Sequence, residues 1–451
     1  MPADPPTRCL ERLPGTSDCA RSPGVRLTIE EAPHATHCRA EVRSRSAKTA
    51  AMKLPAWLAR YPLTPVAIVA SLLGACITPQ LGIDRFTADS PAFEALARSL
   101  LAGRGFTYHE PMFGSFVVHA LRAPGYPVFL ALGNLLGGTG TVLALQGAVN
   151  GLSAALLGAL AVRLWGPGAG WIAFLVRFVW PDGWYHSGQI MSELLYECLA
   201  VLATLVTVAA VGRDSLRGLA CAGLLSVVAL FVRPAGITII GPIGLWLLWK
   251  HWRYALVYGT VVLLAWVPWP IRNALRMHAF VPLTTMGGQV AWVGSTGLDP
   301  PIAWNYMATH LSLGEPGLDR YFWREAVQYA RAHPGEVGER VARKALLNVV
   351  PIGRRPSLWL HRFAFLAALA ALALRECRSR LVLPGGIWLA QGAFGIITNV
   401  MDRYRFTAEW VVVLAAALGV AACAHRFGAR RTAWATATLM LLCVAVSLVY
   451  R

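Results

Sequence analysis

Long apolar runs recur along the chain from about residue 62 to its C-terminus, and they constrain its fold more than any other feature. An α-helix needs roughly 20 mainly apolar residues to cross the hydrocarbon core of a bilayer. Hydrophobic residues make up 56% of the 451 residues and charged residues only 14%, a balance that is unusual for a soluble domain. The runs therefore predict an all-α, polytopic membrane protein.

About eleven of these runs, within a range of about 10–13, are long enough or nearly long enough to cross. The predicted spans are 62–82, 143–163, 167–181, 192–211, 217–232, 235–249, 254–272, 358–374, 381–399, 408–425 and 432–450. The run 126–136 is only about half a span long. We interpret it as an interfacial or re-entrant helix on the outer side, because a crossing there would reverse every later loop.

The formal net charge of +18 comes from basic residues that cluster mostly in short loops between the apolar runs. These loops contain residues 163, 213–217, 250–253, 375–380 and 425–431. With the N-terminus inside, all five lie on the cytoplasmic side, as the positive-inside rule requires. The pattern argues against nucleic-acid binding. It places four polar segments on the outer side, namely 83–125, 181–193, 273–357 and 399–409.

Residues 1–53 differ in composition from the rest of the chain. They are rich in Pro, Arg, Ser, Thr and Glu and contain three cysteines without periodicity, so they predict a disordered extension. Met52 is an alternative translation start. We divide the remainder into a membrane module at 54–272, an outer loop subdomain at 273–357 with helices expected at 321–332 and 335–350, and a C-terminal membrane bundle at 358–451.

Neither a disulfide framework nor a metal site is predicted. The nine cysteines are scattered and form no CxxC pair. His109 and His119 are ten residues apart, which is not a metal-ligand spacing. No P-loop is present either.

The stretch "ADSPAFEALARSLLAGRGF" (88–106) predicts an amphipathic interfacial helix that begins at Ser90 and ends near Gly103. Asp89 immediately precedes it. A helix-capping role and a chemical role both remain open for this carboxylate.

Three arginines could likewise have either a structural or a functional role. Arg122 precedes a Pro-Gly-Tyr-Pro turn, where it could snorkel to the headgroups or clamp a phosphate. Arg177 and Arg233 also lie in or beside apolar runs, where an ionisable group suggests function.

Five motifs in order resemble a known superfamily. They are "DSPAFEALARSLLAGRGF" followed by "RAPGYPVFLAL", "SGQIMSELLYECLAVLA" (187–203), "ALFVRPAGITII" (229–240), "VPWPIRNALRMHAFVPLTTMGGQVAWVGS" (267–295) and "DRYRFTAEWVVVLAA" (402–416). Over residues 57–450 the chain resembles GT-C glycosyltransferases. More narrowly, it resembles the bacterial relatives of protein O-mannosyltransferases and of the lipid A aminoarabinose transferase (glycosyltransferase family 39-like).

The resemblance implies a conserved membrane module, an outer loop and a variable C-terminal bundle. It implies catalytic roles for Asp89, as general base, and for Glu193, where the family more usually has aspartate. Leu121 stands where the aminoarabinose enzyme has a glutamate, so that role is not transferred. The implied donor-phosphate ligands are Arg122, Arg233, Arg272, Arg403 and Arg405. The implied acceptor or sugar contacts are Tyr126, His186, Gln189 and Tyr404.

The resemblance also implies a polyprenyl-phosphate-linked sugar as donor, a protein, lipid or glycan as acceptor, and no cofactor or divalent metal. The expected location is the inner (plasma) membrane, with the site on the periplasmic face. A carboxylate can take the acceptor proton while arginines hold the departing phosphate. A transporter or flippase and a non-catalytic binder of lipid-linked sugars remain alternatives. The sequence shows no internal repeat of the kind many transporters have.

Overall fold

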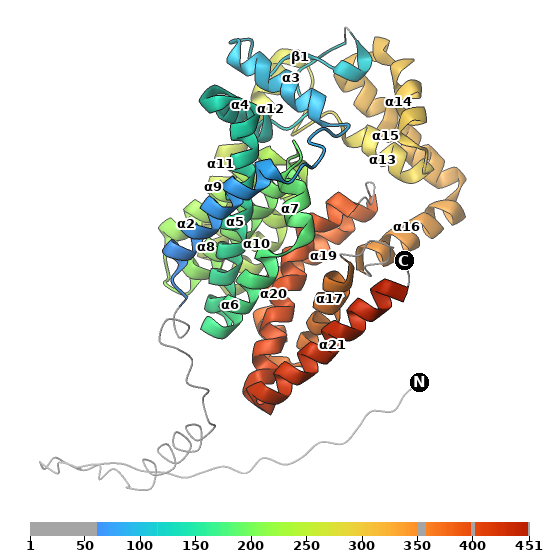
Figure 1. The fold of residues 1–451 in the computed structure, drawn as a ribbon. Coiled ribbons are helices and arrows are strands. Elements are labelled where there is room, and N and C mark those ends of the chain that lie inside the picture. Colours follow the sequence, from blue (N-terminus) through green and yellow to red (C-terminus); the bar gives the residue numbers. More distant parts are fainter. Residues whose placement is uncertain (1–60, 115, 350–357, 398–401, 450–451) are drawn as a thin grey trace, which may run out of the picture. The chain divides into compact units, whose positions relative to one another are not determined.

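The computed structural model describes residues 61–114, 116–349, 358–397 and 402–449 (Figure 1). The described residues belong to one compact unit. The extension predicted at 1–53 and the alternative start at Met52 lie outside the described residues.

The described chain is almost entirely helical, which confirms the predicted all-α class. The first part contains α2 (Leu63–Ile77), α3 (Ser90–Leu101), α4 (Gly125–Gly137), α5 (Thr139–Leu164), α6 (Pro167–Phe178), α7 (Pro181–Ser187), α8 (Glu193–Val211), α9 (Leu216–Val232), α10 (Ile237–Lys250), α11 (Trp252–Trp266) and α12 (Pro268–Met277). The second part contains α13 (Gly287–Thr296), α14 (Pro300–Ala308), α15 (Gly314–Ala332), α16 (Pro334–Val349), α17 (Leu358–Ala373), α18 (Arg375–Arg380), α19 (Val382–Ile397), α20 (Asp402–Phe427) and α21 (Ala429–Val449). A small antiparallel sheet pairs β1 (Tyr108–His109) with β2 (Val117–Val118).

The apolar helices make this a multi-pass membrane protein. Among the described residues, five stretches are long and apolar enough to cross a membrane, namely Leu63–Gln80, Thr139–Leu164, Glu193–Val211, Trp252–Met277 and Tyr404–Phe427. Each predicted span overlaps at least one helix. The number eleven stays a prediction.

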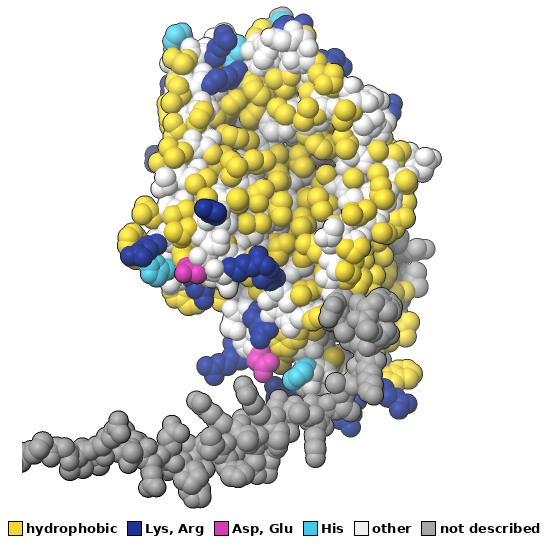
Figure 2. All heavy atoms as spheres, turned by 90° about the vertical axis from the view of Figure 1, so that its left-hand side faces the viewer, with side chains coloured by type: hydrophobic (Ala, Val, Ile, Leu, Met, Phe, Trp, Pro, Cys, Tyr) yellow, Lys and Arg dark blue, Asp and Glu magenta, His cyan; other side chains and the backbone are white. Residues whose placement is uncertain are grey.

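Figure 2 shows a broad hydrophobic surface across one face, with lysines and arginines mainly towards its two ends. Large apolar side chains such as Leu72 of α2, Leu224 of α9 and Leu264 of α11 are exposed on these helices. Such a surface suits contact with lipid tails rather than with water.

Helix α5 is a central packing element, and small residues let its neighbours approach closely. A Cβ atom added to Gly147 would lie 2.0 Å from the carbonyl oxygen of Gly74 in α2, and one added to Gly151 would lie 2.0 Å from that of Ala70. Such backbone-to-backbone contacts are typical of helix pairs in membranes.

The segment 126–136 forms α4, a helix of 13 residues. It ends at Gly138, whose φ of +77° allows the chain to turn directly into α5. Its length is that of the half span expected, and it packs against α3 and α5. Its re-entrant or interfacial placement stays a prediction.

Loops that the charge argument assigns to the same side contact one another in two places. In the set assigned to the cytoplasm, Arg380 lies 4.5 Å over the ring of Trp165 and donates to the carbonyl oxygen of Leu164. Tyr254 donates to Asp214 at 2.6 Å in the same set. The outer-loop elements α3, β1 and α13–α15 gather at one end of the molecule (Figure 1). Which set faces the cytoplasm stays a prediction.

Helices α13–α15 share a small apolar core with Phe113, which lies between β1 and β2. It contains Trp292, Ala303, Met307, Leu318 and Phe322. Helices α15 and α16 occupy the stretch where two helices were expected, with α15 beginning earlier, at Gly314. The boundaries of an outer subdomain at 273–357 stay a prediction.

Candidate functional site

The Asp89 carboxylate is paired with an arginine and does not cap a helix. Asp89 directly precedes α3 with helical backbone angles (φ −88°, ψ −21°), and its side chain makes no capping hydrogen bond. Its Oδ1 atom lies 2.9 Å from Nη2 of Arg122, and 15% of the Asp89 side chain and 10% of the Arg122 side chain are exposed. The side-chain capping interpretation is therefore wrong for this residue. Asp89 and Arg122 therefore form a partly exposed ion pair between two parts of the segment 83–125.

A buried carboxylate of α15 holds the backbone that leads into Arg122. Glu315 accepts hydrogen bonds from the backbone N–H groups of His119 (2.6 Å) and Ala120 (2.8 Å). It also accepts one from the Thr285 hydroxyl at 2.7 Å. Burial lowers the pKa of His119, so the imidazole beside this carboxylate is held towards its neutral form. The outer helices thus fix the loop that presents Arg122.

A second carboxylate–arginine pair lies at the start of α8. Glu193 is buried, and its Oε1 atom lies 2.7 Å from Nη1 of Arg233. The Arg233 guanidinium lies 4.7 Å over the ring of Tyr404 from α20. Three residues that the sequence resemblance selected from distant motifs therefore meet in one cluster.

Hydrogen bonds connect the regions around these two pairs. Ser90, next to Asp89, donates its hydroxyl to the carbonyl oxygen of Ile190 at 3.0 Å. The N–H group of Ile190 donates to the carbonyl oxygen of Arg85 at 2.9 Å. The first outer loop and the segment before Glu193 are therefore held side by side.

Tyr126 and Gln189 take part in internal hydrogen bonds. The Tyr126 side chain is fully buried and donates its hydroxyl to Gln146 at 2.6 Å. The Gln146 amide donates to the carbonyl oxygens of Ser187 and Gln189, each at 2.8 Å. These contacts indicate a role in shaping the segment 187–193, whereas direct acceptor contact by the Tyr126 hydroxyl is not supported by its geometry.

His186 lies at the end of α7 in a buried position. Its ring centre is 4.5 Å from that of Phe406 in α20. Burial lowers the pKa of His186. The ring therefore packs between the outer segment and α20.

Arg405 lines an open cleft between α16, α19 and α20. Its Nε atom lies 3.0 Å from Oε1 of Glu409, one turn later on α20. The cleft has a volume of about 620 Å³, including space open to solvent, and its mainly apolar wall includes Trp388, Ile396 and Tyr404. The side chain of Arg403 lies outside the described part of the structure.

Arg272 donates hydrogen bonds to backbone carbonyl oxygens of the protein. Its guanidinium donates to the carbonyl oxygens of His119 (2.7 Å) and Phe106 (2.9 Å). It also donates to the side-chain oxygen of Asn273 at 2.9 Å. Since three of its hydrogen bonds go to the protein, the geometry favours a role in holding the first outer loop over phosphate binding.

Arg177 is fully buried rather than snorkelling to the membrane surface. It forms an ion pair with Glu197 in α8, and its Nη1 atom donates to Asn150 at 2.9 Å. An arginine in one apolar run and a glutamate in another were the available sequence signals for this pair. Their pairing could not be read from the chain, because it depends on how α6 and α8 pack.

Glu110 is a further buried carboxylate that sequence reasoning did not assign to the site. Tyr108 donates its hydroxyl to Oε2 of Glu110 at 2.9 Å, while Oε1 has no partner among the residues that the structure describes. Burial, and then the neighbouring Glu110, raise the pKa of Tyr108 well above its usual value. No local pattern distinguishes Glu110 from a surface glutamate.

Comparisons with known proteins give a fold but no close relative. No family model and no curated protein sequence matches the chain. The Archaeoglobus fulgidus oligosaccharyltransferase tethered with an acceptor peptide matches with a TM-score of 0.55 at 13% identity, over 87% of this chain and 56% of that one. The same enzyme, AglB, in complex with an inhibitory peptide and a dolichol-phosphate, matches with a TM-score of 0.53 at 14% identity, over 88% and 55%.

ArnT from Cupriavidus metallidurans bound to undecaprenyl phosphate also matches, with a TM-score of 0.38 at 15% identity, over 80% of this chain and 78% of that one. The chain spans a little over half the length of the archaeal enzyme that it matches. The similarity to that enzyme extends across most of the present chain. The chain therefore has a GT-C-like fold.

Proposed function

We propose that the chain is an integral membrane glycosyltransferase that moves a sugar from a polyprenyl-phosphate carrier to an acceptor on the outer face of the membrane. The observation that carries this proposal is the partly exposed Asp89–Arg122 pair at 2.9 Å, a carboxylate and a guanidinium at the mouth of the site. The archaeal enzyme of similar fold was captured with a dolichol-phosphate and with peptides. A dolichol-phosphate belongs to the carrier class of this proposal, the polyprenyl phosphates.

In this proposal, arginines bind the donor phosphate. Arg122 and Arg233 each lie against a carboxylate and are about one-tenth exposed, so a phosphate can reach them from the outer side. Arg405 lines a cleft whose apolar wall suits an isoprenoid chain. Guanidinium groups suit phosphate because they donate two parallel hydrogen bonds.

Asp89 acts as the general base. Its carboxylate takes the proton from the acceptor nucleophile, which attacks the anomeric carbon. The bond between that carbon and the phosphate oxygen breaks, and the electron pair leaves on the polyprenyl phosphate. Direct displacement inverts the anomeric configuration. A phosphate that pairs with Arg122 weakens the attraction between this arginine and Asp89, which makes the carboxylate a stronger base.

Glu193 orients Arg233 and does not take the acceptor proton. It is buried and lies 2.7 Å from that guanidinium. His186, Gln189 and Tyr404 shape the surroundings of the acceptor or sugar. The expected acceptor is a protein, lipid or glycan, and the expected location is the inner membrane with the site on the periplasmic face.

Turnover in liposomes tests the proposal. The purified full chain is reconstituted with a panel of polyprenyl-phosphate sugars that carry a labelled sugar, together with candidate acceptors. Release of free polyprenyl phosphate and transfer of the label to the acceptor are expected for at least one donor. Movement of intact donor across the membrane without cleavage would instead indicate a transporter. Saturable donor binding with neither cleavage nor movement would indicate a binding protein.

A further inference from the structure

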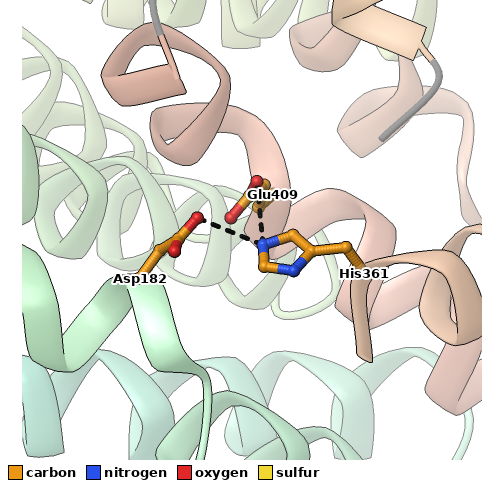
Figure 3. Close-up of side chains that lie close together, drawn as sticks. All are labelled: Asp182, His361 and Glu409. Carbon is orange, nitrogen blue, oxygen red and sulfur yellow. Dashed lines mark hydrogen bonds and ion pairs between the residues drawn. The ribbon is translucent and has the colours of Figure 1, made fainter. Parts of the chain in front are cut away.

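Three buried side chains from separate helices converge on one point. They are Asp182 of α7, His361 of α17 and Glu409 of α20 (Figure 3). The Nε2 atom of His361 lies 3.1 Å from Oδ2 of Asp182 and 3.3 Å from Oε1 of Glu409. Both carboxylates therefore point at the same imidazole nitrogen. We call this set the Asp–His–Glu cluster.

One imidazole nitrogen carries at most one hydrogen, so it cannot satisfy both carboxylates with good hydrogen bonds. Two carboxylates close together in a buried site also repel each other, and Arg405 offsets only one of the two charges. A divalent cation would remove both problems, since it neutralises the two charges and accepts a lone pair from each ligand. The burial of the cluster makes such compensation valuable.

The distances suit a metal. Ligand atoms at about 2.0–2.1 Å from a tetrahedral Zn²⁺ lie roughly 3.3–3.5 Å apart. The separations of 3.1 Å and 3.3 Å at Nε2 are close to that value, and the three ligand atoms all lie within 4.8 Å of one another. Imidazole nitrogen with carboxylate oxygens is a ligand set that Zn²⁺ accepts.

The surroundings hold these ligands in place. Trp180 donates its indole N–H to Oε2 of Glu409 at 2.7 Å, and its ring centre lies 4.4 Å from that of His361. Arg405 donates from Nε to Oε1 of Glu409 at 3.0 Å. Hydrogen bonds of this kind orient ligating carboxylates in metal sites.

Another buried nitrogen lies nearby in sequence. His186 follows Asp182 by one turn of α7, and its Nδ1 atom is buried without a hydrogen-bond partner among the described residues. Positions four apart on a helix share a face. The His186 ring packs against Phe406 with 4.5 Å between ring centres, so we do not count it among the ligands.

We propose that Asp182, His361 and Glu409 bind one divalent transition-metal ion, Zn²⁺ by its ligand chemistry. The ion fixes α7 to α17 and α20, and so holds in place the helix that carries Tyr404 and Arg405. It takes no part in the transfer of the sugar. The inference therefore stands whether or not the glycosyltransferase assignment is correct.

Metal binding is measured on the full chain, purified in detergent and stripped with a chelator. Zn²⁺ is added, the excess is removed, and the retained metal is counted. One ion per chain is expected. The unfolding temperature should rise by about 3–5 °C at a free Zn²⁺ concentration near 100 times the dissociation constant.

The variant Asp182→Asn/Glu409→Gln keeps the shape of both side chains but weakens two ligands. Its affinity for Zn²⁺ should fall roughly 100-fold or more. His333→Ala, at an exposed histidine outside the cluster, is the matched control and should bind as the wild type does. Equal retention by the double variant and the wild type would overturn the proposal.

A measurement on the wild type keeps the test decisive if the double variant does not fold. Co²⁺ replaces Zn²⁺ in such sites and gives a visible absorption band that reports its geometry. A band typical of a four-coordinate ion with a nitrogen ligand is expected. Retention of less than one-tenth of an ion per chain, with an unfolding temperature that Zn²⁺ does not change, would show that a protonated His361 neutralises the carboxylates instead.

Discussion

The Asp89–Arg122 pair and the Arg177–Glu197 pair have the same chemistry in two different surroundings. The side chains of the outer pair are 15% and 10% exposed, whereas both side chains of the membrane pair are 1% exposed. In the function proposed above, the partly exposed Arg122 exchanges its carboxylate for a phosphate, whereas the sealed Arg177 stays paired with Glu197. We therefore expect the Asp89–Arg122 pair to take part in the proposed reaction and the Arg177–Glu197 pair to stabilise the fold.

The largest effect is expected from breaking the sealed pair. Arg177→Met leaves the Glu197 carboxylate buried without its guanidinium, which should destabilise the fold by about 3–5 kcal/mol. The unfolding temperature of purified protein, or the yield of folded protein, measures this loss. The double variant Arg177→Met/Glu197→Leu should recover most of the stability. A single variant as stable as the wild type would remove the structural role of this pair.

A smaller effect is expected at the outer pair, and on binding instead of folding. Arg122→Lys keeps the charge but loses the planar pair of donors. Donor affinity should weaken by about 10- to 100-fold, the equivalent of about 1.5–3 kcal/mol for a charge-assisted hydrogen bond. Binding of a labelled polyprenyl phosphate to detergent-purified protein measures it. Unchanged affinity, with an unchanged unfolding temperature, would take Arg122 out of the donor site.

Glu315 should affect both stability and donor binding, because it accepts hydrogen bonds from the backbone just before Arg122. In Glu315→Gln, the amide nitrogen cannot accept one of the hydrogen bonds from His119, Ala120 or Thr285. The expected cost is about 1–3 kcal/mol of stability, with weaker donor binding alongside it. Glu339→Gln, on the exposed side of α16, is the matched control for both measurements. A loss of stability without any change in donor binding would mean that donor binding does not depend on this carboxylate.

The smallest effect is expected at an exposed pair. Arg340 and Glu336 of α16 are separated by 2.9 Å, but they lie in contact with water, where such pairs contribute little. Glu336→Gln should leave the unfolding temperature and turnover unchanged within error. A clear drop in either one would show that exposure does not distinguish structural from incidental pairs in this molecule.

The helical, membrane-spanning fold could be predicted from the sequence because apolar runs of span length have few alternatives. The segment 126–136 forms a helix of about the expected length, and its interfacial or re-entrant placement stays a prediction. The ordered motifs selected five residues that form two groups of contacts in the structure. Asp89 pairs with Arg122, while Arg233 pairs with Glu193 and stacks on Tyr404.

Contacts between distant parts of the chain could not be predicted. Asp182 and His361 are 179 residues apart, and nothing in either local sequence points to the other. The partners of Arg272 could not be predicted either, because a basic residue at a span end looks the same whether it faces a phosphate or two backbone carbonyls. The Asp89 side chain was compatible with capping until the structure gave its partner. In each case the missing information was the relative placement of helices.

Turnover of Asp89→Asn is the most direct test of the account. Asparagine is nearly the same shape as aspartate, so folding and expression should be retained, but its amide cannot accept the acceptor proton. We predict that turnover of the purified variant falls by roughly 10²–10⁴-fold at matched protein levels, with donor binding retained. Asp84→Asn, five residues earlier in the same loop, is the control and should stay close to the wild type. An Asp89→Asn enzyme with wild-type turnover would contradict the assignment of Asp89 as the general base.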